Sequence, residues 1–180
     1  MTQQTKEQND DGSVTVVTSR RVKPGYEDEF EKWLEGIGAA ASKYPGYMWR
    51  RVTRPKDHDL PEYVVVFKFD SYPHLRAWTS SEERREWLDR VKPLALDEYK
   101  ETVLTGRVEA GGEPVSGAFV RLLDGSGEFT AEVVSSASGA FRFFAAPGTW
   151  TLRALHRSGN GEARVTADAP GLHDTVVKVA

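Results

Sequence analysis

The chain has 180 residues, enough for one large domain or two small ones. Its 24 Lys and Arg against 27 Asp and Glu give a formal charge of -3, so no strong positive field favours nucleic acid or an anionic membrane. Its longest apolar runs, such as Val64–Phe67, are far shorter than the about 20 residues of a membrane-spanning helix, and the lack of cysteine excludes disulfides and thiolate chemistry.

The polar start of the chain, residues 1–12, lacks the apolar segment of a secretory signal. We interpret it as a disordered tail and expect a cytoplasmic location.

Composition changes near residue 100. All six tyrosines and four of the five tryptophans lie at or before Tyr99, whereas eleven of the sixteen glycines follow residue 100. We therefore divide the chain into an α+β half (residues 13–97) and a sandwich half (residues 98–180).

The α+β half alternates strand and helix signals. Apolar residues recur at steps of three and four between Tyr26 and Tyr44, the period of an amphipathic helix. Runs rich in valine and aromatic residues predict strands, and serines at capping positions predict helix starts. The expected elements are a strand at 13–22, a helix at 26–44, strands at 47–54 and 62–69, a short helix capped by Ser71, and another opened by Ser80-x-x-Glu83. This order predicts a ferredoxin-like α+β sandwich that lacks its final strand.

The sandwich half has no comparable helix. Short runs rich in Val and Phe are separated by turn residues at intervals of about 8 to 12 residues, which predicts an antiparallel β-sandwich. The expected strands are 101–109, 117–123, 128–136, 140–145, 149–157, 161–167 and 173–179.

The segment that joins the two halves could supply a strand to either of them. The α+β half needs a fourth strand near residues 96–108, whereas the sandwich half needs ETVLTGRV, residues 101–108, as its first strand. Either the first sheet keeps an open edge, or this segment runs on from one sheet to the other. An open edge is a template for pairing with a second chain, so we expect a homodimer.

The α+β half resembles the antibiotic biosynthesis monooxygenase (ABM) family over about residues 13–94. The resemblance rests on Val16–Gly25, Glu29–Leu34, Tyr44–Gly46, Pro61–Tyr63 and Leu75–Ser81. It implies a ferredoxin-like domain of the dimeric α/β barrel type. Some members oxidise aromatic polyketides without metal or flavin, and others degrade haem.

The sandwich half is similar to a bacterial domain of unknown function that is linked to thiosulfate sulfurtransferases. Its strand pattern also resembles the carboxypeptidase regulatory-like and transthyretin-like (Ig-like) sandwiches. The resemblance rests on Thr105–Val108, Gly117–Asp124, Glu128–Val134, Phe141–Gly148 and Trp150–Leu155. It implies a sulfurtransferase as a partner.

The family's known catalytic residues do not carry over. Polyketide-oxidising members have an Asn, a Trp and a Tyr where this chain has Val65, Phe69 and Val52, and haem-degrading members have an iron-ligating His where it has Leu88. We therefore expect no cofactor. The Asp57-His58-Asp59 loop is interpreted as a solvated tip, not a metal site.

Some polar and aromatic side chains could still face a cavity between sheet and helices. Each also has a structural interpretation: the tryptophans as core, Arg51 as a solvated strand residue, and His74 as a surface residue. The candidate substrate-binding residues are Ser19 (or its neighbour Thr18), Trp49, Arg51, Tyr63, His74 and Trp78.

Two functions fit these observations. The first is an ABM-like protein that binds or oxidises a small aromatic or quinone-like molecule. The second is a non-catalytic dimeric interaction module whose sandwich docks a sulfurtransferase.

Overall fold

The computed structural model describes residues 13–55, 62–97, 100 and 102–180. The expected tail, residues 1–12, and the Asp57-His58-Asp59 loop lie outside the described residues. Among the described residues, no helix has the length and apolar character needed to cross a membrane.

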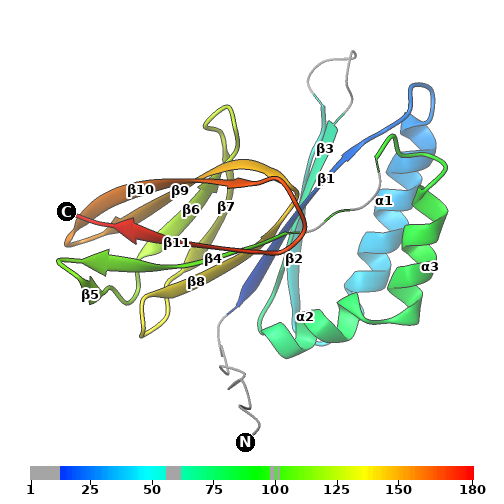
Figure 1. Ribbon diagram of the computed structural model, residues 1–180. Helices are drawn as coiled ribbons and strands as arrows, with labels where there is room; N and C mark the ends of the chain where they lie inside the picture. The colour runs from blue at the N-terminus through cyan, green and yellow to red at the C-terminus, as the bar shows by residue number, and fades with distance from the viewer. Residues whose placement is uncertain (1–12, 56–61, 98–99, 101) are drawn as a thin grey trace, which may run out of the picture.

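The α+β half forms the elements that its periodicity predicts, with boundaries shifted by one or a few residues. Its helices lie on one side of its strands (Figure 1). Its elements are β1 (Val14–Arg21), α1 (Glu27–Ala41), β2 (Tyr47–Thr53), β3 (Glu62–Phe69), α2 (Tyr72–Thr79) and α3 (Glu82–Val91).

The sandwich half is all strand and turn, with one very short strand, β5, that the sequence pattern did not reveal. Its elements are β4 (Thr102–Ala110), β5 (Glu113–Pro114), β6 (Phe119–Leu123), β7 (Phe129–Val134), β8 (Ala140–Ala145), β9 (Gly148–His156), β10 (Gly159–Ala167) and β11 (Leu172–Lys178). The expected fold class, a ferredoxin-like α+β sandwich followed by an all-β sandwich, is confirmed.

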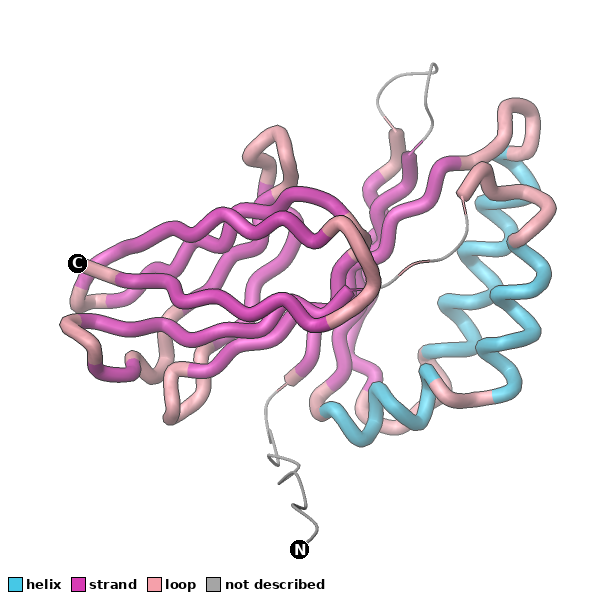
Figure 2. The backbone as a smooth tube through the Cα atoms, in the orientation of Figure 1, coloured by secondary structure: helices cyan, strands magenta, loops and turns pink. Residues whose placement is uncertain are grey.

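The strands form two sheets, and the larger one runs through both halves. Its order is β11-β4-β8-β1-β3-β2, with β5 paired to β4, while the second sheet has the order β10-β9-β6-β7. Figure 2 shows the continuous layer of strands that passes from the sandwich to the helix-covered end.

The junction differs from both alternatives raised by the sequence. β8 pairs with β1 in parallel, with Thr15 opposite Phe143 and Val16 opposite Phe144, while β4 pairs with β8 inside the sandwich. At the other end of β1, Leu96 N–H donates to Arg21 O at 2.8 Å. The edge of β1 is therefore covered by two segments instead of one fourth strand, and the argument for a dimer through an open edge at this place does not hold.

The sheet of the α+β half is buried on both faces. One face packs against α1, α2 and α3. On the other face, the fully buried Val17 and Val66 belong to the same apolar cluster as Leu104, Val120 and Trp150 of the sandwich. The two halves thus share a sheet and part of a core.

The helix caps differ from expectation at two serines. The Ser81 hydroxyl, one residue after the expected Ser80, accepts the Arg84 N–H at 3.1 Å and caps α3. The Ser71 side chain makes no cap bond and donates to Asp70 Oδ1 at 2.9 Å. α3 is fixed to α1 because the Trp33 indole N–H donates to Trp87 O at 2.7 Å.

Candidate functional site: a cationic aromatic cavity

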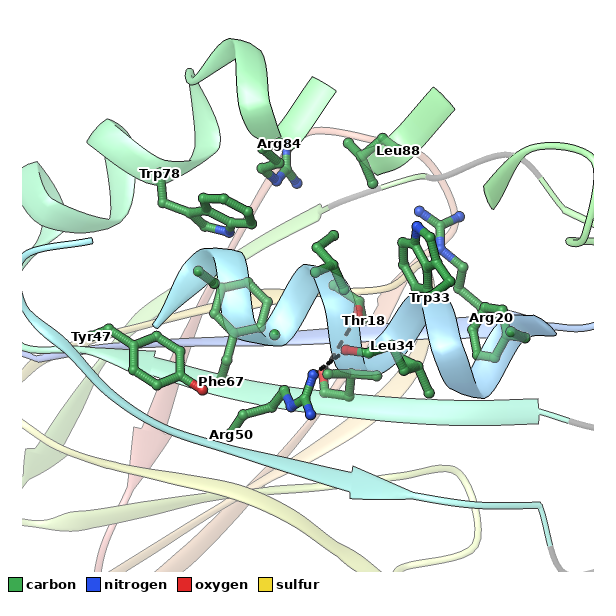
Figure 3. Close-up of a pocket in the computed structure, with 15 residues that line it drawn as sticks. Thr18, Arg20, Trp33, Leu34, Tyr47, Arg50, Phe67, Trp78, Arg84 and Leu88 are labelled. Atoms are coloured by element: carbon green, nitrogen blue, oxygen red, sulfur yellow. Dashed lines mark hydrogen bonds between the residues drawn. The ribbon is translucent and has the colours of Figure 1, made fainter. Parts of the chain in front are cut away.

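A cavity lies between the helices and the inner face of β1, β3 and β2. About 600 Å³ of space that no protein atom fills lies in it and in front of it, a figure that includes open solvent at its mouth. It is lined by Thr18, Arg20, Phe30, Trp33, Leu34, Ile37, Gly38, Ala41, Tyr47, Arg50, Val65, Phe67, Trp78, Arg84 and Leu88 (Figure 3).

One end of the cavity is aromatic. Tyr47 from the start of β2, Phe67 from β3 and Trp78 from α2 surround it (Figure 3). Trp78 is 2% exposed, and its ring packs edge-on against Tyr44 with centroids 5.0 Å apart. Burial raises the pKa of the Tyr47 phenol, although Arg50 acts against the shift, so the phenol keeps its proton at neutral pH. This end can hold a flat apolar ring beside a hydrogen-bond donor.

Three arginines line the same cavity from three elements: Arg20 from β1, Arg50 from β2 and Arg84 from α3. Arg50 Nη1 donates to Leu34 O, and Arg84 Nη1 donates to Thr79 O at 3.3 Å. Within the described part of the chain, no Asp, Glu or His lines this cavity. The described walls therefore carry three cationic side chains.

A glycine in α1 makes room for one of these guanidinium groups. A Cβ atom at Gly38 would overlap Nη1 and Cζ of Arg50. The Arg50 head thus lies directly against the helix backbone, where it reaches the Leu34 carbonyl.

Among the candidates from the sequence, Trp78 and Thr18, the alternative to Ser19, line the cavity, and the others lie outside it. Thr18 faces inward, whereas the Ser19 hydroxyl donates to Glu62 Oε1 at 2.6 Å, since neighbouring strand residues point to opposite faces. Tyr63 is 4% exposed and packs on Phe30 with ring centroids 4.7 Å apart.

Trp49 and Arg51 point to the face of the sheet that meets the sandwich. Arg51 Nη2 donates to Thr130 O in β7, and its Cζ lies 5.3 Å from the centroid of the Phe129 ring. Trp49 is 39% exposed. These two residues thus lie at the contact between the halves or on its rim.

His74 lies on the surface, with its Nδ1 at 2.6 Å from Asp70 Oδ1. This hydrogen bond holds the pKa of the Asp70 carboxyl below its usual value. A ligand-binding role for any of the six candidates remains a prediction.

The cavity also contains residues that the sequence analysis did not select: Arg20, Tyr47, Arg50 and Arg84. Arg20 follows the buried Val14 and Val16 at even spacing, so strand alternation places it on their face, but the sequence could not show which face lines the cavity. No such signal exists for Arg50. The irregularity between Tyr47 and Trp49 lets Tyr47 and Arg50, three residues apart, line the same cavity.

The four apolar residues at the positions of the monooxygenase family's catalytic residues lie in the cavity or beside it. Val65 and Leu88 line the cavity, whereas Val52 and Phe69 pack in the clusters beside it. Residues 13–55, 62–97, 100 and 102–180 contain no group of three or more His, Cys, Asp or Glu that could hold a metal ion.

Comparison with known proteins assigns both halves. Residues 89–179, half of the chain, match the family described as protein of unknown function (DUF1416). The chain belongs to the DUF1416 family. Residues 13–90 of this DUF1416 protein match the antibiotic biosynthesis monooxygenase family, so both resemblances found in the sequence are confirmed.

Individual relatives cover one half each. A Mycolicibacterium smegmatis protein is 64% identical over 89 residues, 49% of this chain and 99% of its own length. A Mycobacterium tuberculosis protein is 62% identical over 88 residues, 48% of this chain and 88% of its own. The structure of SnoaB, a cofactor-independent oxygenase from Streptomyces nogalater, is 20% identical over 49% of this DUF1416 chain and 88% of its own, with a TM-score of 0.43.

Proposed function

We propose that the α+β half binds a small aromatic or quinone-like molecule in its cavity and oxidises it with O₂ without metal or flavin. One observation carries this proposal: aromatic rings and three arginines line one cavity in a domain that matches the antibiotic biosynthesis monooxygenase family. Such a cavity can hold a flat substrate away from water while it stabilises a negative charge on it.

The chemistry would run through a substrate anion. A CH₂ group beside an aromatic ketone loses a proton to solvent, and the resulting enolate transfers an electron to O₂. Recombination forms a carbon–oxygen bond, and loss of water leaves a carbonyl, so that CH₂ + O₂ gives C=O + H₂O. The arginines supply the charge that stabilises the enolate.

Oxygen consumption with anthrone tests the proposal. We expect uptake and an anthraquinone product in mass spectrometry, above a blank of heat-denatured protein. Trp78→Phe should lower the rate because the smaller ring loosens the aromatic end, whereas His74→Ala, which lies outside the cavity, should not. Uptake equal to the blank across a panel of anthrones and quinols would overturn the oxidation step.

The homodimer is also part of this proposal, with a different surface from the one first expected. β2 is an edge strand of the large sheet, and Met48 and Trp49 on it are 51% and 39% exposed. An apolar edge strand favours pairing with a second copy. A monomeric mass in analytical ultracentrifugation at tens of micromolar would contradict it. The cytoplasmic location and the sulfurtransferase partner remain predictions.

A further inference from the structure

We propose that the cavity selects a planar aromatic anion and that Arg50 is the residue that binds its acid group. This inference names the substrate class of the proposed function and rests on it. The ligands of this class have a flat ring system with one attached carboxylate or ionised enol.

The charges around the cavity provide the first argument. Three guanidinium groups line it, and among the described lining residues none is acidic. A cation in a partly closed, apolar site loses hydration, and a ligand of opposite charge offsets that cost. A neutral aromatic molecule would fill the same space without offsetting it.

Arg50 is the arginine for which the hydrogen bonds support anion binding most directly. It donates to the Leu34 carbonyl, which uses part of a guanidinium that has five N–H donors. Glu31 is the carboxylate that Arg50 influences, but both its oxygens accept from Arg54, at 2.7 and 2.8 Å. Among the described residues, therefore, no carboxylate forms a direct ion pair with Arg50.

The position of Arg50 fits a flat ligand. It enters from β2 beside Tyr47 and Phe67, while Trp78 and Arg84 enter from the opposite, helical side (Figure 3). A ring held among Tyr47, Phe67 and Trp78 would place an attached acid group beside Arg50. The planar guanidinium can bind a carboxylate through two parallel hydrogen bonds, which also fixes the ring's orientation.

Binding of 3-hydroxy-2-naphthoate and of its uncharged methyl ester, measured by titration calorimetry on the full chain, tests the inference. We expect the acid to bind at least about tenfold more tightly than the ester, the effect of charge-assisted hydrogen bonds. Arg50→Gln should reduce that preference to near one, and Arg50→Lys should retain part of it. Arg85→Gln, at an exposed arginine of α3 that does not line the cavity, should leave it unchanged.

The outcomes separate this inference from the proposed function. Equal binding of acid and ester overturns the preference for an anion but does not contradict binding of an aromatic molecule in the cavity. A full preference in a folded Arg50→Gln variant, with folding checked by circular dichroism, overturns the role of Arg50. If Arg50→Gln does not fold, the Arg50→Lys variant decides, since an undiminished preference there also contradicts bidentate binding. Absence of binding by acid and ester alike overturns the proposed function together with the inference.

Discussion

At the scale of single residues, the face of the sheet to which a strand side chain points decides whether that side chain lines the cavity. Alternation along β1 places Thr18 and Arg20 inside and Ser19 outside. It predicts that Thr18 and Arg20 share a face, but Val16 and Val17 are buried on opposite faces, so the sequence could not show which face lines the cavity. In β2 the irregularity after Tyr47 changes the alternation, so Arg50 faces the cavity and Arg51 does not. A local backbone irregularity leaves no clear mark in the sequence, which is why Arg50 was missed.

Gly38→Ala tests the close approach of Arg50 to α1. The added methyl group would overlap the guanidinium and displace it, because a long side chain moves more easily than a helix backbone. We expect naphthoate affinity to fall about tenfold, while helix stability is retained, since alanine is favoured over glycine in a helix by about 1 kcal/mol. Titration calorimetry and thermal unfolding measure the two effects.

Gly36→Ala is the matched control two residues away. A Cβ atom there would overlap the ring of Trp87, whose own carbonyl accepts the Trp33 indole. We expect a lower melting temperature with little change in the ratio of acid to ester binding. Unchanged naphthoate affinity in Gly38→Ala would show that Arg50 does not need its present position.

At the scale of elements, local periodicity predicted α1 and alternating strands such as β9 because each buries one face with its own period, whereas β1, buried on both faces, was predicted from its valine-rich run. The two-residue β5 is too short to show a period. The Ser80 and Ser81 pair contains two adjacent capping residues, and the structure uses the second one. The parallel pairing of β1 with β8 joins residues that are far apart in the sequence, and no local pattern indicates it.

The segment after α3 is tied to the end of β1 by a pH-sensitive pair. Arg21 Nη2 and Nε donate to the two Asp97 oxygens at 2.5 and 2.6 Å, and these bonds hold the pKa of Asp97 below its usual value. A carboxyl whose pKa is lowered by folding stabilises the fold above its unfolded pKa of about 3.9 and loses that effect as pH falls through the folded value.

Asp97→Asn should therefore be less stable than the parent chain at neutral pH, and the difference should disappear as the pH falls through the lowered pKa of Asp97. Urea unfolding at several pH values measures the difference. The pair is largely exposed, so we expect a small effect. A difference between the two chains that persists unchanged into acid would exclude Asp97 as its cause.

At the scale of the whole molecule, the large sheet makes the two halves dependent on each other. Composition and family resemblance predicted that the chain changes near residue 100 from mixed helix and strand to strands alone. The division into two separate units between residues 97 and 98 remains a prediction. The sequence could not show that β8 of the sandwich lies beside β1, or that Val17 and Val66 lie in the sandwich core. We propose that the halves unfold together.

Val17→Ala in the full chain tests this dependence. Val17 is 0% exposed and faces the sandwich, so the truncation should cost roughly 2 kcal/mol. Hydrogen exchange with mass spectrometry should show faster exchange in β6 and β9 as well as in β3. Faster exchange confined to residues 13–97 would show that the sandwich folds independently.

The most direct test of the account is a crystal structure of the full chain with 3-hydroxy-2-naphthoate. The account predicts a naphthalene ring among Tyr47, Phe67 and Trp78, with the carboxylate within hydrogen-bonding distance of the Arg50 guanidinium. A cavity closed by its own side chains, or a ligand bound elsewhere on the protein, would contradict it.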